Sequence, residues 1–551
     1  MSKDLVPQAL RQEWRARGWC PGEDVFSVFT TRVREHPGKV AVIDDKGETS
    51  YAQLSREALA VAKALSAEGV RAGDIVGIYL PNRHEACAVE LGIAAIGAAS
   101  IAFPVMYRAK EVRSLLGRSR AVACITMNSH NGFDHAMVVR GLIDELPDLR
   151  SCLVLGGQVP GCISLDPVLA AAGDSRGDSR GSWAGLRSDR YSGAPARIMV
   201  TSGTEGEPKM VQYHHDALIG GIANQLTVFG GNAAMRLFLL PPISSGFGSL
   251  ATFGVITRHG ATLVLTDTFQ PANVLQAMAA HDVTILCAVP AMMHVLLDGQ
   301  KSAGGVTPAL RTIYLAGAPI PQALVERALA VFGCDVVSAY GCSDGAFCCT
   351  RPEDPPDKIA TTVGRPTAMV CSFKIVGRDG NELRPGEIGE IWARGPISPL
   401  AYLNSPNLDR RYRDPQGWTK TGDLGTLDED GYLRVVDRLK DIIIRGGFNI
   451  SPAEIEGELI RHPAVSQAVC VGVPHERLGE VTCACVTLLP AATAPTLGDL
   501  RGFLTQRGLA KHKLPDELRI VQAVPVNPAG KVLRRELRDS AAEWAREEAR
   551  A

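Results

Sequence analysis

The stretch Thr201–Lys209 concentrates groups that could bind phosphate. It reads Thr-Ser-Gly-Thr-Glu-Gly-Glu-Pro-Lys and follows the apolar residues 198–200, which we predict to end a strand. Glycines let backbone N–H groups approach a polyanion, hydroxyls add hydrogen-bond donors, and a final lysine adds a mobile positive charge. The stretch is not a Walker A loop, because that spacing is missing and Met210 follows the lysine. On composition alone, a polar surface turn explains it equally well.

Three later segments place small residues directly after apolar runs. We predict strands over 237–240, 312–315 and 336–339, and each runs into a loop rich in small residues: 241–248, 316–319 and 340–344. The carboxyl ends of strands share one edge of an α/β sheet, and ligands bind at that edge. A single loop glycine is ordinary, but three such loops in order favour a ligand site.

Strand and helix patterns in the first 110 residues predict the sheet that these loops require. Strands are expected over 39–44, 74–80 and 101–105, with helices from Tyr51 and over 84–99. Ser50 and Gln53 have the spacing of a capping box at the first of these helices. Strand–helix–strand units of this kind predict an α/β fold in which helices cover a parallel sheet.

The pattern becomes β-rich after about residue 370 and then changes again. Strands are expected over 372–376, 389–393 and 432–436, and the charged residues 437–441 follow. A compact α+β segment comes next, and its first helix is marked by Ser451 and Glu454 as a capping box with Pro452 at the first helical position. We therefore predict a large domain over 1–439 and a small one over 440–551.

Composition narrows the class of protein. The chain has 551 residues, 46% hydrophobic and 21% charged, with a net charge of −1, which argues against nucleic acid or an anionic membrane as partner. Its 14 cysteines form no C-x-x-C pair, so reduced and mostly buried thiols in a cytoplasmic protein are expected. The longest uncharged run, 91–107, is interrupted by two glycines and a proline, which disfavours a membrane span. The polar repeat at 173–182 is expected to be a mobile surface loop.

Seven segments, in order, resemble the adenylate-forming superfamily of acyl-CoA synthetases, peptide-synthetase adenylation domains and luciferases. They are the segments 201–209, 316–319, 340–344, 386–390, 417–423, 437–456 and 525–531. The resemblance covers roughly residues 25–540, and it implies a large N-terminal domain with a small mobile lid. It also implies ATP and Mg²⁺ as cofactors, with a small carboxylic acid as substrate and CoA as co-substrate.

The resemblance assigns roles in the first step, in which a carboxylate attacks the α-phosphate of ATP. Lys531, Ser343 and Asp344 are the implied catalytic residues; Lys531 bridges the carboxylate and the α-phosphate, and Asp344 also holds Mg²⁺. The implied phosphate loop comprises Thr201, Ser202, Gly203, Thr204, Gly206 and Lys209. The implied nucleotide contacts are Gly317, Ala318, Pro319, Ser338, Ala339, Tyr340, Gly341, Cys342, Asp423, Val435 and Arg438. Among these, Asp423 accepts from the ribose hydroxyls.

For the second step, the resemblance implies a rotation of the small domain. Lys440 occupies the hinge position, and the rotation withdraws Lys531 and presents Gly446 and Gly447 beside the thiol tunnel. A Gly-Gly turn after a strand is the plain alternative for the last two residues.

Four positions depart from the superfamily's commonest pattern. Glu205 puts a carboxylate in a loop for anions, Asp344 and Ser343 replace glutamate and threonine, and Ser338 stands where an amide is common. None of these changes removes an essential group.

The acid pocket is expected to be large. Its predicted residues are Ile243, Ser244, Ser245, Gly246, Gly317 and Gly341, and the small residues Gly220, Gly221 and Gly248 are expected to widen it. We expect a bulky aryl, cyclic or polycyclic acid, as in secondary metabolism.

Several alternatives stay open at this point. The acceptor could be a carrier-protein phosphopantetheine in place of CoA, and a homodimer is left open as the assembly. A nucleotide-binding regulator with an inactive site is disfavoured by the presence of Lys531, Asp423 and Asp344. Nothing in the sequence favours a luciferase-like oxygenase.

Overall fold

The chain folds into two compact units in the computed structural model, which describes residues 4–174, 193–201, 208–303, 309–318, 320–445, 448–526 and 532–550. The first unit comprises residues 1–373 and 393–420, and the second comprises 374–392 and 421–551. Strands from 421 to 439 therefore group with the C-terminal part of the chain. The predicted domain boundary at Lys440 stays a prediction.

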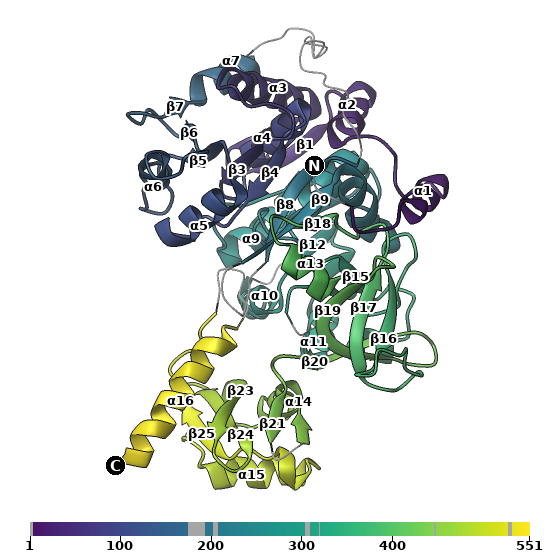
Figure 1. Ribbon diagram of the computed structural model, residues 1–551, viewed down its shortest axis with the longest axis vertical. Coiled ribbons are helices and arrows are strands. Elements are labelled where there is room, and N and C mark those ends of the chain that lie inside the picture. Colours follow the sequence, from purple (N-terminus) through teal and green to yellow (C-terminus); the bar gives the residue numbers. More distant parts are fainter. Residues whose placement is uncertain are drawn as a thin grey trace. The chain divides into compact units, whose positions relative to one another are not determined.

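Two eight-stranded sheets form the framework of the first unit (Figure 1). The order in one sheet is β15-β14-β13-β12-β10-β11-β1-β2, and in the other it is β18-β9-β8-β4-β3-β5-β6-β7. The strands of the first sheet are β1 (Val40–Asp44), β2 (Gly47–Ser50), β10 (Arg236–Leu239), β11 (Thr262–Val264), β12 (Ile285–Ala288), β13 (Thr312–Leu315), β14 (Asp335–Cys342) and β15 (Ala346–Cys349). Those of the second are β3 (Ile75–Tyr79), β4 (Ala99–Ala102), β5 (Ala123–Met127), β6 (Ser151–Leu155), β7 (Ile163–Ser164), β8 (Pro195–Thr201), β9 (Lys209–His214) and β18 (Ala401–Tyr402).

Parallel pairing of β10, β12, β13 and β14 confirms the predicted α/β architecture. Helices connect and cover these sheets, because each parallel connection must return over a face of its sheet. They are α1 (Gln8–Ala16), α2 (Val25–Glu35), α3 (Tyr51–Ala67), α4 (His84–Ile96), α5 (Ala109–Ser119), α6 (His135–Ile143), α7 (Asp166–Asp174), η2 (Ala217–Ile222), α8 (Asn224–Val228), η3 (Leu250–Arg258), α9 (Pro271–Ala280), α10 (Pro290–Ala303), α11 (Gln322–Phe332), α12 (Pro356–Thr361) and α13 (Pro406–Tyr412).

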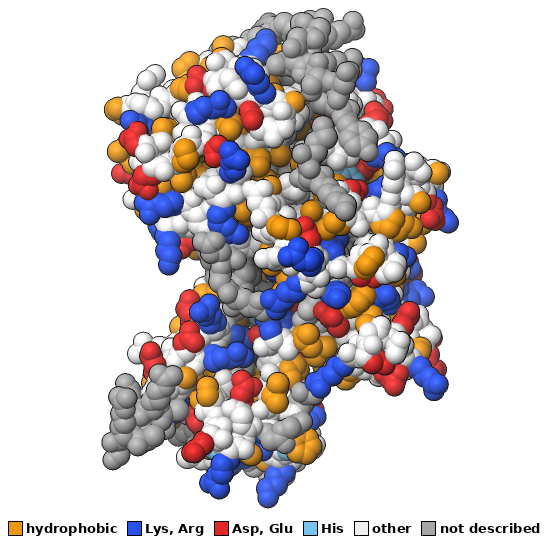
Figure 2. Space-filling view, viewed as in Figure 1, with side chains coloured by type: hydrophobic (Ala, Val, Ile, Leu, Met, Phe, Trp, Pro, Cys, Tyr) orange, Lys and Arg blue, Asp and Glu red, His pale blue; other side chains and the backbone are white. Residues whose placement is uncertain are grey.

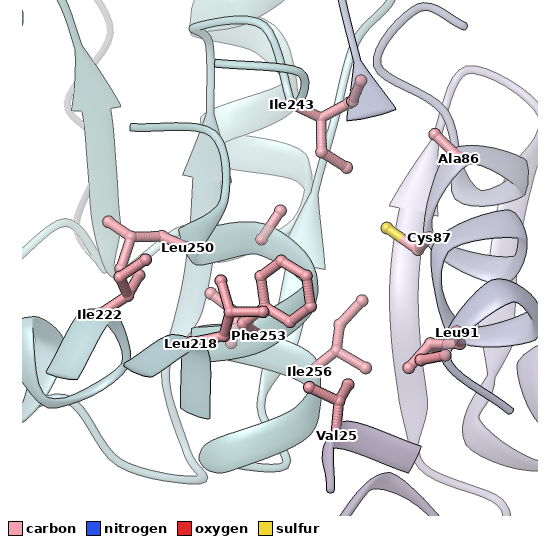
Figure 3. Close-up of a cluster of buried hydrophobic side chains, with 14 of the residues drawn as sticks. Val25, Ala86, Cys87, Leu91, Leu218, Ile222, Ile243, Leu250, Phe253 and Ile256 are labelled. Atoms are coloured by element: carbon pink, nitrogen blue, oxygen red, sulfur yellow. The ribbon is translucent and has the colours of Figure 1, made fainter. Parts of the chain in front are cut away.

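The main apolar core joins α4, η2 and η3 (Figure 3). Phe253 and Ile256 of η3 and Leu91 of α4 are fully or almost fully buried there. Burying a side chain of this size stabilises the fold by about 1.5–3 kcal/mol. Ile243, from the loop after β10, belongs to the same core, so the core fixes the position of that loop.

Two element boundaries differ from the sequence-based expectation. The helix from His84 ends at Ile96 and the next strand begins at Ala99, because Gly97 adopts a left-handed φ of +83° that ends the helix. The strand from Asp335 does not end at Ala339. It continues to Cys342 and forms an antiparallel hairpin with β15, so part of the predicted loop 340–344 is strand.

The second unit contains two sheets, one of four and one of five strands. The first has the order β16-β17-β19-β20, and the second has the order β22-β21-β24-β23 with β25 paired to β24. Their strands are β16 (Ser372–Val376), β17 (Gly389–Arg394), β19 (Thr419–Leu427), β20 (Leu433–Arg438), β21 (Ile443–Arg445), β22 (Phe448–Ile450), β23 (Val465–His475), β24 (Gly479–Leu488) and β25 (Glu517–Ile520). The helices are α14 (Pro452–Leu459), α15 (Leu497–Gln506), η4 (Lys511–Lys513) and α16 (Arg534–Arg550).

Both predicted helices with capping boxes exist, but neither box forms as expected. Ser50 accepts a hydrogen bond from the Gln53 amide at 3.2 Å, while the Gln53 side chain donates to Glu57 instead of returning the bond. The Ser451 side chain donates to Asp437 at 2.5 Å and makes no cap bond. Asp437 also accepts from the Ala453 amide at 3.3 Å, so a carboxylate from β20 takes the capping role at α14.

Basic and acidic side chains are interspersed over the face of the molecule in Figure 2. Within the described residues, every helix is too short or too polar to cross a bilayer.

Candidate functional site

The centre of the candidate site is Asp344, in the turn between β14 and β15. Its carboxylate is largely buried, and one oxygen accepts a hydrogen bond of 2.5 Å from the Tyr402 hydroxyl. The other oxygen lies 3.6 Å from Lys209 Nζ. A residue of the predicted phosphate loop and the predicted metal ligand are therefore adjacent.

Lys209 is held between this carboxylate and two aromatic rings. It is the first residue of β9, paired with Thr201 at the end of β8 in an antiparallel hairpin. Its Nζ lies 3.7 Å from the ring centroid of Tyr412 and 5.5 Å from that of Tyr402. A cation over an aromatic face is attracted by the ring quadrupole, so these rings orient the ammonium group.

Two tyrosines fix the turn that carries Asp344. Burial, and then the nearby Asp344 charge, raise the pKa of Tyr402 far above its ordinary value, so its hydroxyl stays protonated and donates to the carboxylate. Tyr213 donates to the Ser343 carbonyl at 3.1 Å, and burial also raises the pKa of Tyr213 well above its ordinary value. The turn is therefore positioned before any ligand binds.

The Ser343 side chain touches the loop that follows β10. A Cβ atom added at Gly246 would lie 2.8 Å from Ser343 Oγ. The loop predicted to bind the acid and the turn predicted to bind ATP and metal are thus in direct contact, and a larger residue at 246 would push them apart.

The predicted adenine contacts lie just after the C-terminal end of β13 and along β14. Gly317 adopts a φ of +91°, which favours glycine, and Ala318 follows it half-buried. Tyr340 is half-buried, with its ring centroid 6.3 Å from that of Phe373. Gly341 is exposed and Cys342 is half-buried.

Ser338 and Ala339 are buried within β14. The Ser338 amide donates to Thr350 Oγ1 at 2.9 Å, while the Ser338 side-chain oxygen has no hydrogen-bond partner among the described residues. A buried hydroxyl without a partner is uncommon, so this oxygen is available to a ligand group.

The predicted ribose carboxylate belongs to the second unit. Asp423 and Arg438 lie opposite each other in β19 and β20, and Asp423 Oδ1 is 3.0 Å from Arg438 Nε. Asp423 is buried, Val435 is half-buried opposite Gly425, and Lys440 is exposed just after β20. The arginine therefore orients the carboxylate within this unit.

Several predicted residues lie outside the described part of the chain. These are Ser202, Gly203, Thr204, Glu205, Gly206, Pro319, Gly446, Gly447 and Lys531. Their roles stay predictions, and the polar repeat at 173–182 falls almost entirely outside as well.

The structure corrects the argument for a pocket widened by glycine. A Cβ at Gly221 would lie 2.2 Å from the Ile397 amide, one at Gly248 would lie 2.0 Å from the Pro242 carbonyl, and one at Gly220 would lie 2.8 Å from the Trp19 carbonyl. At these three positions, backbone atoms of neighbouring segments pack against the glycine Cα, so the missing side chain leaves no volume for a substrate. Their presence in the sequence therefore carries no information about substrate size.

Two of the predicted acid-pocket residues serve to build the loop. The Ile243 amide donates to Asn82 at 2.8 Å, and its carbonyl accepts from the buried Arg197 at 2.9 Å. Ser245 Oγ donates to the Pro242 carbonyl and accepts from the Gly248 amide, at 2.7 and 2.8 Å. Ser244 is buried between them.

Sequence reasoning missed Tyr402, Tyr412 and Arg413. Arg413 is 6% exposed, and its guanidinium nitrogens have no hydrogen-bond partner among the described residues. Its charge opposes the effect of burial on the pKa of Tyr213 and Tyr402, so it lies near the turn that carries Asp344. The aromatic and basic run after residue 401 was the available signal, but its contact with Asp344 is visible only in the fold.

The residues around Asp344 fit a magnesium ion. Mg²⁺ prefers carboxylate oxygens and is usually held by one or two carboxylates together with substrate phosphates. Asp344 offers such an oxygen, and Lys209 can move from it to a phosphate. The Tyr402 hydroxyl would keep the remaining oxygen satisfied.

The chain matches the family model described as AMP-binding enzyme over residues 29–403, and the model described as AMP-binding enzyme C-terminal domain over 454–531. It is 33% identical over 524 residues to a methyl-dioxo-octahydroindenyl-propanoyl:CoA ligase of Rhodococcus jostii (strain RHA1), with 93% of this chain and 98% of that protein covered. It is 31% identical to a salicyl-AMP ligase / salicyl-S-ArCP synthetase of Mycobacterium tuberculosis, with 96% and 93% covered.

A solved structure gives the same result for the fold. The o-succinylbenzoate CoA synthetase of Bacillus subtilis, in complex with its acyl-adenylate intermediate, superposes with a TM-score of 0.79 at 27% identity, covering 94% of this chain and 98% of that one. The chain therefore belongs to the AMP-binding enzyme family, within the adenylate-forming superfamily. It is an adenylate-forming enzyme that activates an acid.

Proposed function

We propose that this enzyme activates a bulky cyclic or aryl carboxylic acid as its acyl-adenylate and transfers the acyl group to CoA. The observation that supports it most is the contact of Lys209, Asp344 and Tyr402 beside the loop after β10. The relatives named for an indenyl-propanoyl and a salicyl group favour a ring-bearing acid.

In the proposed first step, the acid carboxylate attacks the α-phosphate of ATP and pyrophosphate leaves. Two anions must approach, so the site must stabilise the negative charge of the transition state. Lys209, with Thr201 and the loop between them, binds the outgoing phosphates, and Ser343 donates to the α-phosphate. Asp344 would hold Mg²⁺, which supplies charge neutralisation when bound, while Lys531 would bridge the carboxylate and the α-phosphate.

In this proposal the adenine and the ribose are each recognised by a separate group of residues. Gly317, Ala318 and Tyr340 flank the adenine, and the side-chain oxygen of Ser338 is available to its edge. Asp423, oriented by Arg438, accepts from the ribose hydroxyls, because a carboxylate can accept from two donors at once.

In the proposed second step, the acyl-adenylate is attacked by a thiol and AMP leaves. The small domain rotates at Lys440, which removes Lys531 and brings Gly446 and Gly447 to the thiol. The name of the Rhodococcus relative supports CoA as the acceptor. The name of the Mycobacterium relative, which includes a carrier protein, supports the alternative acceptor.

The test uses the full-length enzyme in pyrophosphate exchange with a panel of acids, from acetate to bicyclic carboxylic acids. We expect exchange with ring-bearing acids and little with acetate, and Asp344→Asn is the matched control that should lose it. Preference for acetate would contradict the proposed acid class.

A second experiment tests the acceptor. Adenylate formed with the best acid is offered either CoA or a phosphopantetheinylated carrier protein, and mass spectrometry identifies the thioester that forms.

A further inference from the structure

A second cluster of ionisable groups lies in the first unit, on elements that carry none of the predicted site residues. It comprises Asp44 at the end of β1, Glu57 in α3, and His84 and Glu85 at the start of α4; we call it the β1–α4 cluster. The three carboxylates are buried, with exposed fractions of 9%, 3% and 5%, and His84 is half-buried.

The cluster is close-packed around the imidazole. His84 Nδ1 lies 2.8 Å from Asp44 Oδ2 and 3.3 Å from Glu85 Oε2, and His84 Nε2 lies 3.6 Å from Glu57 Oε2. One imidazole thus faces three carboxylate oxygens. A neutral imidazole carries one N–H, so it can satisfy only part of this arrangement.

Two of these buried oxygens have no hydrogen-bond partner in the part of the chain that the structure describes. They are Oε2 of Glu57 and Oε2 of Glu85, and both are directed at His84. Three basic side chains lie near the cluster in sequence. Lys46 pairs with the other Glu85 oxygen, whereas Arg83 pairs with Asp267 and Arg56 donates to the Ala172 carbonyl. Counted without the imidazole, the three carboxylates and Lys46 leave an excess of two negative charges, and a protonated imidazole would cancel only one of them. Buried charge of this kind requires a counter-ion.

The spacing of the ligand atoms suits a metal ion. Ligand atoms of Asp44, His84 and Glu85 lie within 4.8 Å of one another. Tetrahedral ligands at bond lengths of about 2.0–2.1 Å from zinc are about 3.3 Å apart. The separation of 3.3 Å between His84 Nδ1 and Glu85 Oε2 matches that value. Asp44 Oδ2, now at the hydrogen-bond distance of 2.8 Å from Nδ1, would move outward by about half an ångström when an ion replaces the shared proton.

We propose that Asp44, His84 and Glu85 bind a divalent transition-metal ion of the Zn²⁺ class, with Glu57 as the outer carboxylate. His84 Nδ1 is the nitrogen ligand, and Asp44 and Glu85 each contribute one oxygen. The proton then resides on Nε2, which faces Glu57 Oε2 at 3.6 Å and would donate to it after a small approach. This is the carboxylate–histidine–metal arrangement that fixes the tautomer of a ligating histidine. A solvent water completes the set of four ligands.

The cluster has a route to solvent. A cavity of about 270 Å³ shares Glu85 with the cluster, and Lys46, the ion-pair partner of Glu85, also lines this cavity. Lys46 Nζ occupies one Glu85 oxygen and leaves the inner one for the ion. The cavity therefore supplies an entry path, which a metal site requires.

The site would tie the end of β1 to the start of α4. Asn82, two residues before His84, holds the loop after β10, because its side chain donates to the Pro241 carbonyl at 3.0 Å and accepts from the Ile243 amide at 2.8 Å. The ion would therefore stabilise the segment that supports the acid-binding loop, and no catalytic step involves it.

The test uses the full-length enzyme, stripped with a chelator and titrated with Co²⁺ and with Zn²⁺ in the absence of nucleotide. We expect one equivalent of Co²⁺ to give the visible absorption of four-coordinate N/O ligation, without the charge-transfer band of thiolate ligation. Zn²⁺ should displace it and raise the unfolding temperature of the wild-type protein. Glu57→Gln, which removes the outer carboxylate, should weaken binding about 10- to 100-fold, and His84→Gln, which removes a ligand, should weaken it more than Glu57→Gln does.

Two controls separate this site from other metal ligands. His36→Gln replaces an exposed histidine and should bind Co²⁺ as the wild type does, and Asp344→Asn should leave the absorption unchanged because it removes only the proposed magnesium ligand. The proposal is overturned if wild-type enzyme shows no Co²⁺ absorption and no Zn²⁺-dependent rise in unfolding temperature. It is also overturned if folded His84→Gln binds Co²⁺ with wild-type affinity.

Discussion

At the scale of single residues, the candidate site depends on groups that hold Asp344 in place before ATP arrives. The carboxylate is buried and needs donors, and within the described residues the Tyr402 hydroxyl and the Lys209 ammonium approach it. Because Lys209 is the more distant of the two, it can transfer to a phosphate while Tyr402 remains. Electrostatic preorganisation of this kind is a large term in phosphoryl transfer.

The variant Tyr402→Phe tests whether the Tyr402 hydroxyl holds the Asp344 carboxylate in place. The substitution leaves a buried carboxylate oxygen without its donor, which costs about 1–3 kcal/mol. We expect the midpoint of denaturant unfolding to fall, and pyrophosphate exchange to decrease by about tenfold for each 1.4 kcal/mol lost from the transition state.

Tyr412→Phe is the matched control, since it keeps the ring that lies under Lys209, and among the described residues the Tyr412 hydroxyl has no hydrogen-bond partner. Its effect on stability should stay below about 0.5 kcal/mol. Equal losses in the two variants would show that the hydrogen bond to Asp344 has no special role.

At the scale of elements, the loop after β10 illustrates how a glycine can be misread. The absence of side chains at 246 and 248 suggests open volume in the sequence, but in the fold the space is filled by Ser343 Oγ and by the Pro242 carbonyl. The loop therefore owes its small residues to close packing.

Gly248→Ala should be strongly destabilising for this reason. A Cβ 2.0 Å from a carbonyl oxygen forces the backbone to move, and overpacking of this kind costs about 3 kcal/mol or more. Thermal and denaturant unfolding measure the change.

Gly141→Ala serves as the control, because it places the same methyl group in open space on the exposed surface of α6. Alanine is favoured over glycine within a helix by about 0.5–1 kcal/mol, so this variant should be slightly more stable than wild type. Little change in Gly248→Ala would restore the open-pocket interpretation.

At the scale of the whole molecule, the proposed two-step reaction depends on a change of position at Lys440. Lys531→Ala should abolish adenylate formation and leave thioester formation from synthetic adenylate largely intact. Lys440→Pro should have the opposite effect, because proline fixes φ at the proposed hinge without touching the groups of the first step. The two half-reactions are assayed separately, and equal loss in both by both variants would refute the hinge.

The 14 cysteines give a second prediction at this scale. Eleven of them are buried and Cys162, Cys334 and Cys342 are half-buried. Burial raises the pKa of Cys20 to about 12, and it does the same at Cys371. At about pH 8, we therefore expect an aromatic disulfide reagent to label at most three thiols in the folded enzyme and all 14 after unfolding.

The same pKa shifts set a pH dependence of stability. Unfolded thiols ionise near pH 8.5, whereas the buried ones stay protonated, so the unfolded state loses protons first. The contribution to stability is full below that pH and declines as pH rises above it. A free energy of unfolding that increased from pH 8 to pH 10 would contradict the burial of these thiols.

The sequence by itself determined the family and most of the architecture. Seven ordered motifs and the alternation of strands and helices were sufficient, because local hydrophobic periodicity fixes elements and motif order fixes their assembly. The sequence also identified Lys209 as a candidate phosphate-binding residue and Asp344 as a candidate metal ligand. It identified Asp423 and Arg438 as candidate nucleotide contacts. Local signals missed the continuation of β14 to Cys342, since pairing with β15 extends that strand.

Only the tertiary structure decided which side chains surround the candidate site residues and hold them in position. Tyr402 follows Asp344 by 58 residues, and Tyr412 lies still farther along the chain. Even so, the Tyr402 hydroxyl contacts the Asp344 carboxylate, and the Tyr412 ring lies under the Lys209 ammonium. The role of Gly246 depended on Ser343 and that of Gly221 on Ile397, both distant in sequence. The gathering of Asp44, Glu57 and His84 likewise joins residues from three different elements. Contacts of this kind arise from packing of whole elements, and no local pattern of residues encodes them.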